Sequence, residues 1–161
     1  HLLMLLFFIA FYTGMRLGEI VNMRRNWINF EENTITIISD YGFSSKSKKE
    51  RKIPIHNNIL EILVSNTNNI QMKDFVFRKG LKNGYKKDNV SKKFKKIVRS
   101  CGLNDKIHFH SLRHSFASIL VQKGISLYVV KELLGHENLS TTQVYSHLQI
   151  SNLNEAIQQF D

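Results

Sequence analysis

Runs of apolar residues and their spacing predict a mainly helical chain with one short β-region. The first run, from Leu2 to Tyr12, is continuously apolar, which is typical of a buried core helix. It is too short to cross a bilayer, which needs about 20 apolar residues. Gly14 interrupts the run. Thr13 is expected to cap a second helix that ends near Met23 and holds Arg16 in its first turn.

Two β-prone segments follow. Residues 34–38 read TITII and residues 51–55 read RKIPI, and the turn between them is polar and rich in Lys. This pattern favours a hairpin or a small antiparallel sheet. With helical periodicity elsewhere, the predicted fold class is α+β, a mainly α-helical domain with a small antiparallel β-sheet.

Several further helices are predicted downstream. They cover residues 57–64, residues 88–101, a segment that ends at Gly124, and residues 127–134. A short helix or turn at 141–146 carries Tyr145, and an apolar stripe predicts a last helix at 150–161. In the helix that ends at Gly124, four residues at helical spacing are expected to face the core and to leave Arg113 and His114 at the side: Leu112, Phe116, Ile119 and Leu120.

The charge of the chain adds a candidate partner. The 161 residues fit one domain, and 23 Lys and Arg against 13 Asp and Glu give a formal net charge of +10. Such a balance favours a polyanionic partner through phosphate contacts and counterion release, although a basic protein without a nucleic-acid role remains an alternative. Residues 73–96 concentrate the basic side chains and suit a surface that follows a phosphate backbone. A basic helix and loop that face only water are the alternative there.

The stretch HFHSLRHSFAS, at 108–118, holds the most distinctive candidate chemistry. His110, Arg113 and His114 are spaced so that a helix brings them to one face. Arg presents a fork of donors that matches phosphate oxygens, and His exchanges protons near neutral pH. A solvated His pair is the plain alternative. A zinc site fits poorly, because Ser111 stands where a metalloprotease motif needs Glu and Cys101 is the one Cys.

Five motifs occur in a fixed order along the chain. They are T-G-x-R-x-x-E at 13–19, a Lys in a basic hairpin, H-x-L-R-H at 110–114, L-G-H at 134–136, and a Tyr nine residues after that His. Together they resemble the catalytic domain of the tyrosine recombinases, the phage-integrase family of DNA strand exchangers. The resemblance implies the DNA breaking-rejoining fold over residues 1–161. Because the chain opens at His1 without Met, we expect a fragment of a longer protein whose N-terminal DNA-binding domain is absent here.

The resemblance also implies roles for named residues. Arg16 and Arg113 would clamp the scissile phosphate, with His136 adding a hydrogen bond. Tyr145 would be the nucleophile and His110 its proton acceptor. Lys46 would protonate the leaving 5′ oxygen, with Lys48 as the close competitor. Glu19 and His114 would support these catalytic residues. The basic residues expected to contact DNA are Lys48, Lys49, Arg51, Lys86, Lys87, Lys92 and Lys93.

The function implied is site-specific recombination or integration of DNA, as in a mobile genetic element, through a 3′-phosphotyrosine and without metal or cofactor. The implied partners are double-stranded DNA, a homotetramer in which the helix at 150–161 docks on a neighbour, and accessory DNA-bending proteins. We expect the protein to lie in the bacterial cytoplasm, at the nucleoid when it is bound to DNA, and not to bind a membrane. A type IB topoisomerase, a catalytically silent DNA-binding module and a metal-dependent nuclease are the alternatives.

Overall fold

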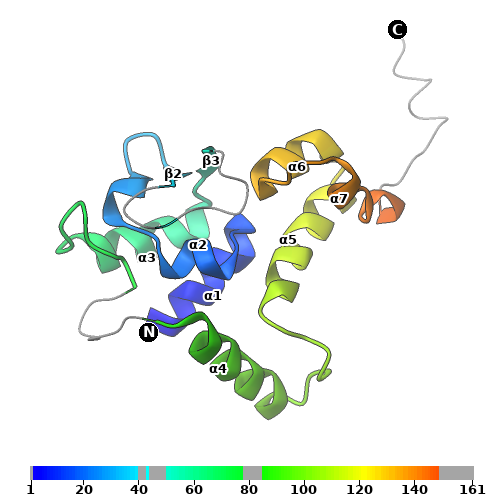
Figure 1. The fold of residues 1–161 in the computed structure, drawn as a ribbon, viewed down its shortest axis with the longest axis horizontal. Coiled ribbons are helices and arrows are strands. Elements are labelled where there is room, and N and C mark those ends of the chain that lie inside the picture. Colours follow the sequence, from blue (N-terminus) through cyan, green and yellow to red (C-terminus); the bar gives the residue numbers. More distant parts are fainter. Residues whose placement is uncertain (1, 40–42, 44–49, 78–84, 149–161) are drawn as a thin grey trace, which may run out of the picture.

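The structure is a computed structural model that describes residues 2–39, 43, 50–77 and 85–148. Helices dominate these ranges, and a small sheet lies to one side of them (Figure 1). The predicted fold class is therefore confirmed. The elements in chain order are α1 (Leu2–Thr13), α2 (Leu17–Val21), the 3-10 turn η1 (Arg25–Trp27), β1 (Ile28–Asn29), β2 (Thr34–Ile37), β3 (Arg51–Pro54), α3 (Asn57–Thr67), α4 (Lys87–Ser100), α5 (His110–Gln122), α6 (Leu127–Leu134), α7 (Ser140–Gln143) and the 3-10 turn η2 (Ser146–Leu148).

The sheet has three antiparallel strands in the order β1-β2-β3. Ile35 of β2 pairs with Ile53 of β3 on one side and Ile28 of β1 on the other. The two longer strands match the predicted segments to within one residue, whereas β1 was not predicted because two residues are too few to show a period of two. Along β3 burial alternates, so Arg51 faces the same way as the buried Ile53.

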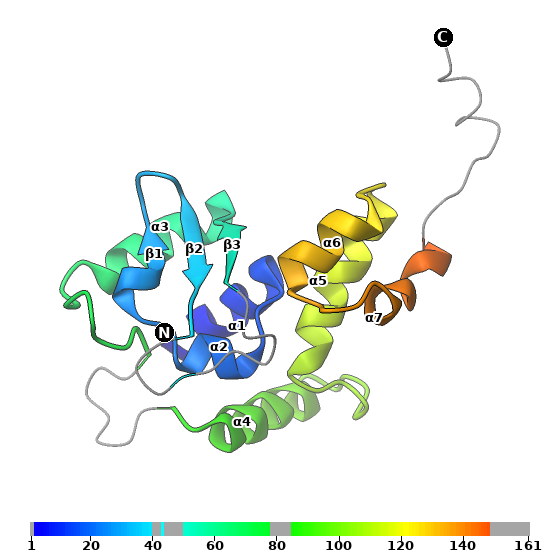
Figure 2. The ribbon, with the colours of Figure 1, turned by 45° about the horizontal axis from the view of Figure 1, so that its top comes forward.

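Helix α1 lies at the centre of the fold. In both ribbon views the sheet and α3 lie on one side of it, and α5 and α6 lie on the other (Figure 2). Its inner positions, such as Leu6 and Ile9, are fully buried in the main core. The predicted core helix is therefore confirmed, although Met4 and Phe8 on its outer side are 51% and 40% exposed. In the described part of the chain, no helix is long and apolar enough to span a bilayer.

The junction between α1 and α2 differs from the prediction by a few residues. Thr13 ends α1 instead of capping α2, and its hydroxyl donates to the Ile9 carbonyl and accepts from the Met15 N–H. Arg16 occupies the N-cap of α2 rather than its first turn. Gly14 makes the sharp connection at a φ of 63°, and a Cβ there would lie 2.5 Å from the Phe116 ring. Only glycine therefore lets α5 pack this closely on the junction.

Helix α5 confirms its predicted core face in part, because Leu112, Phe116 and Leu120 are partly buried against the core. Arg113, Ala117 and Val121 are its buried residues, while Ile119 is 38% exposed. The prediction placed Arg113 at the side of the helix, next to the apolar positions. The structure buries it to 2% exposure because α5 packs between α1 and α6, where backbone carbonyls accept from the guanidinium.

The ends of the other helices follow glycine signals closely. Helix α6 matches the predicted range and ends at Gly135, whose φ is 65°. Gly102 and Gly124 also take positive φ after α4 and α5. Helix α3 runs three residues past its predicted end, because the Thr67 hydroxyl donates to the Leu63 carbonyl and Thr67 itself is buried.

Candidate active site

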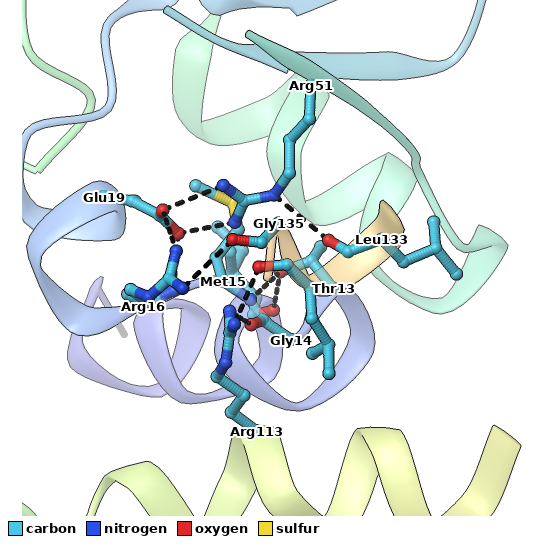
Figure 3. A network of polar contacts seen from close by, with 11 residues as sticks. Thr13, Gly14, Met15, Arg16, Glu19, Arg51, Arg113, Leu133 and Gly135 are labelled. Atoms are coloured by element: carbon cyan, nitrogen blue, oxygen red, sulfur yellow. Dashed lines mark hydrogen bonds and ion pairs between the residues drawn. The ribbon is translucent and has the colours of Figure 1, made fainter. Parts of the chain in front are cut away.

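Three arginines meet at the C-terminal end of α6. Nε of Arg51 donates to the Leu133 carbonyl at 3.1 Å, Nη2 of Arg113 to Leu134 at 2.7 Å, and Nη2 of Arg16 to Gly135 at 3.2 Å. The last carbonyls of a helix lack partners within the helix and carry partial negative charge, so cations stabilise them. Figure 3 shows Arg51 approaching from the sheet and Arg113 from α5. The end of α6, and His136 directly after it, is thus held from three directions.

Glu19 joins two of these arginines. Its carboxylate accepts from the backbone N–H of Arg16 at 2.7 Å, from Arg16 Nη1 at 3.2 Å, and from both Nη atoms of Arg51 at 2.9 and 2.7 Å. Its side chain is only 2% exposed. Burial raises the pKa of Glu19, but the bonds from Arg51 and the contacts with Arg16 outweigh it, so the pKa is lowered. Glu19 is therefore a buried carboxylate that orients both guanidinium groups.

Arg113 and Arg16 differ in exposure. Arg113 donates to Gly14 at 2.6 Å as well as to Leu134, and is almost completely buried. Burial and the neighbouring Arg16 lower its pKa, yet an arginine stays protonated at neutral pH. The Arg16 side chain keeps 23% of its surface exposed. Arg113 therefore carries a positive charge beneath the surface, and Arg16 carries one at the surface.

Tyr145 lies between α7 and η2 and is 6% exposed. Its hydroxyl is 2.6 Å from Nδ1 of His114. The His110 ring lies edge-on to the His114 ring, with the centroids 4.8 Å apart. The structure thus corrects the expected pairing: His114, and not His110, holds the tyrosine hydroxyl. On helix α5 it is therefore the second His of the motif that faces Tyr145.

His136 is oriented by α7. Its Nδ1 is 2.8 Å from Oγ1 of Thr142, a fully buried side chain. This bond occupies Nδ1 of the half-buried His136, so Nε2 is the ring nitrogen that could contact an anion. Thr142 was not predicted as a site residue, although the T-T-x-x-Y-x-H pattern that surrounds Tyr145 contains it.

The site favours neutral histidines and a protonated tyrosine. Burial and nearby cations lower the pKa of His110 to about 4, with His114 and Arg113 adding to the effect. Burial and then Arg113 lower the pKa of His136 to about 4 as well. Burial lowers the pKa of His114 and raises that of Tyr145. At neutral pH the imidazoles can therefore accept a proton or a hydrogen bond, and the Tyr145 hydroxyl keeps its proton unless a base removes it.

We expect the chain to lose stability as the pH falls from 7 to 4. His110 and His136 have pKa values near 4 when folded and near 6.5 when unfolded, so the unfolded state binds more protons across this window. The free energy of unfolding therefore has its full value above pH 6.5, the pKa of these histidines in the unfolded chain, and it falls as the pH approaches 4. Urea unfolding at pH 7.5 and pH 5 measures the effect, and His110→Gln with His136→Gln should flatten it. A midpoint at pH 5 equal to that at pH 7.5 would contradict the expectation.

Several predicted residues fall outside the described ranges. Lys46, Lys48 and Lys49 lie in the segment 44–49, and the predicted last helix lies at 150–161. Arg51 is described and contradicts its prediction as a DNA contact. Its side chain is 7% exposed and its guanidinium is occupied by Glu19 and Leu133, so it offers no face to a phosphate.

The lysines of α4 lie on the exposed side of the helix. Val90, Phe94 and Val98 form its buried face, which leaves the predicted DNA contacts Lys86, Lys87, Lys92 and Lys93 exposed. Lys87 packs on the start of α2, where its Nζ would lie 2.9 Å from a Cβ at Gly18. Lys92 lines a hollow of about 460 Å³ together with His108 and His110. The hollow thus joins the basic face of α4 to His110 at the start of α5.

In the described ranges, no group of three or more His, Cys, Asp or Glu side chains is placed to hold a metal ion.

The mainly helical fold with a small sheet is similar to that of solved recombinases, among them XerA and XerH. The chain belongs to the phage integrase family, whose family model matches residues 2–152. It is 34% identical over 140 residues to a tyrosine recombinase of Thermosipho africanus, which covers 87% of this chain and 47% of that protein. It is 32% identical over 160 residues to tyrosine recombinase XerA of Pyrococcus horikoshii, with 96% and 53% covered.

A solved structure supports the same assignment. The XerH site-specific recombinase bound to difH substrate, in a pre-cleavage complex, superposes with a TM-score of 0.76 at 28% identity. That match covers 97% of this chain and 46% of the XerH chain. The chain therefore spans about half the length of the relatives it matches.

Proposed function

We propose that this chain carries out the strand-transfer chemistry of a site-specific DNA recombinase, through a 3′-phosphotyrosine at Tyr145. The observation that carries the proposal is the contact of 2.6 Å between the Tyr145 hydroxyl and His114, in the same site as the arginines held at the end of α6. Membership of the phage integrase family and the likeness to a recombinase bound to its DNA substrate support it.

In the proposed reaction, Tyr145 Oη attacks the scissile phosphorus and forms a phosphotyrosine ester. Its proton passes to Nδ1 of His114, the nitrogen that already faces it. The bond from phosphorus to the 5′ oxygen breaks, and that oxygen takes a proton from the lysine of the basic hairpin, assigned to Lys46 by motif. Arg16 and Arg113 stabilise the negative charge on the non-bridging oxygens, and His136 adds a hydrogen bond. Attack by a second 5′ hydroxyl reverses the steps and rejoins the strand.

Double-stranded DNA is the proposed substrate, and the exposed lysines of α4 are the proposed phosphate contacts. A homotetramer on DNA, with the segment 150–161 docked on a neighbour, accessory DNA-bending proteins and a place at the bacterial nucleoid complete the proposal. A type IB topoisomerase would use the same ester chemistry, but the family match and the recombinase relatives favour strand exchange between two DNA sites.

The experiment that tests the proposed function uses the chain with nicked duplexes, in which the short 5′-hydroxyl fragment diffuses away after cleavage. In the presence of a chelator, a denaturing gel should show a covalent protein–DNA adduct, because no metal takes part. An intact chain that binds DNA and forms no adduct would contradict strand transfer. Cleavage that the chelator abolishes would favour a nuclease instead.

We expect His114→Gln to slow adduct formation more than His110→Gln. His114 receives the nucleophile's hydrogen bond, and loss of a general base typically costs about 10²- to 10⁴-fold in rate. His110 touches His114 edge-on and no hydrogen bond joins it to Tyr145 in the described structure, so its loss should leave partial activity. Single-turnover rates on one nicked duplex measure both variants. A slower rate for His110→Gln than for His114→Gln would instead indicate that His110 is the general base.

A further inference from the structure

Among the described residues that were expected to contact DNA, Arg51 is the one whose side chain is fully engaged in hydrogen bonds within the protein. It is the first residue of β3, and its side chain turns inward with that of Ile53. All three guanidinium nitrogens are used: both Nη atoms bind Glu19, and Nε binds the Leu133 carbonyl. Its packing on Gly135 is also tight, because a Cβ there would lie 2.8 Å from Arg51 Cδ.

These contacts connect three separate parts of the site. Glu19 belongs to α2 and also holds the backbone N–H and the guanidinium of Arg16. Leu133 and Gly135 belong to the end of α6, where Gly135 accepts from Arg16. Arg51 therefore closes a ring that runs from the sheet through Glu19 to Arg16, and through α6 back to the sheet. Arg16 is the one member of this ring that the proposed reaction brings to the phosphate.

We propose that Arg51 is a positioning residue: it fixes Arg16 against the scissile phosphate by holding Glu19 and the end of α6 at the same time. This inference rests on the proposed function and adds a residue that does not itself touch DNA. A planar fork is required, because lysine has one nitrogen and cannot reach two carboxylate oxygens and a carbonyl in fixed directions. Charge alone at position 51 is therefore insufficient.

The first test is Arg51→Lys in single-turnover adduct formation. We expect a rate about 10²-fold lower, which is the typical cost of displacing a catalytic group by about 1 Å. The affinity for DNA should change by less than about threefold, since Arg51 offers no face to a phosphate. Arg99→Lys is the matched control, because Arg99 also makes two bonds to one carboxylate, Asp105, but on an exposed surface at the far end of α4.

A second substrate separates positioning from general weakening of the fold. A duplex with a methylphosphonate at the scissile position is neutral there, so correct placement of the Arg16 charge matters less. We expect Arg51→Lys to lose less than about tenfold on this substrate. Equal slowing on both substrates would overturn the proposal and leave Arg51 a structural residue, as would unchanged rates on both.

A double-mutant cycle tests whether Arg51 acts through Arg16. If it does, Arg16→Lys with Arg51→Lys should be no slower than Arg16→Lys alone. Additive losses would overturn the proposal. Should Arg51→Lys fail to unfold cooperatively in urea, Arg51→Gln, which keeps a neutral donor, takes its place in both tests. Failure of the unsubstituted chain to form an adduct would instead refute the proposed function, so the two failures are distinguishable.

Discussion

Tyr145→Phe is expected to abolish the covalent protein–DNA adduct while leaving DNA affinity within about threefold of the unsubstituted chain. The change removes one oxygen, the atom that would form the ester, and keeps the ring in its buried place. The phosphate contacts proposed for the arginines and for α4 remain. Adduct formation on a denaturing gel and binding by fluorescence anisotropy measure the two effects separately.

Tyr128→Phe is the matched control for that variant. Tyr128 lies on α6 and is 68% exposed, so Tyr128→Phe should change neither adduct formation nor DNA affinity. The lost hydrogen bond to His114 should cost Tyr145→Phe about 1 kcal/mol of folding stability, which leaves it folded. An adduct that persists in Tyr145→Phe at the normal rate would refute the role given to Tyr145.

Glu19→Gln is expected to have the largest effect on stability. It removes the carboxylate charge between Arg16 and Arg51 and leaves the buried Arg51 guanidinium without a counter-charge. Breaking a buried pair by neutralising one partner typically costs about 3–5 kcal/mol. Urea unfolding of the purified chain measures the loss, which should also reduce the adduct rate because Arg16 loses the same partner.

The surface pair of Glu32 with Lys52 supplies the control for this stability prediction. Both side chains are about half exposed, at 52% and 53%, and such pairs contribute about 0–1 kcal/mol. Glu32→Gln should therefore leave the unfolding midpoint almost unchanged. A loss in Glu19→Gln no greater than in Glu32→Gln would show that the ring of contacts around Glu19 does not stabilise the fold.

The sequence allowed the fold class and most element positions to be predicted, because their signals are local. Gly102, Gly124 and Gly135 stop their helices where expected, and the period-two segments became β2 and β3. The very short β1 and the exact cap of α2 could not be predicted, since both depend on tertiary contacts.

The residues of the site were harder to assign than its position in the chain. Whether His110 or His114 faces Tyr145 depends on the rotation of α5, which its packing on α1 and α6 sets. Arg51 looked like one of several solvated cations after the Lys-rich turn. Its alternation with Ile53 and Ile55 on one strand face was the available signal, and it indicated an inward side chain.

The most direct test of the central claim is to identify the residue that carries the DNA in the adduct. Tryptic cleavage after Lys131 releases Glu132–Asp161, which contains no further Lys or Arg and only one of the five tyrosines, Tyr145. Mass spectrometry should find a nucleotide joined through its 3′ phosphate to this peptide at Tyr145, with a free 5′ hydroxyl on the other DNA fragment. A nucleotide on any other residue, or one joined through a 5′ phosphate, would contradict the account.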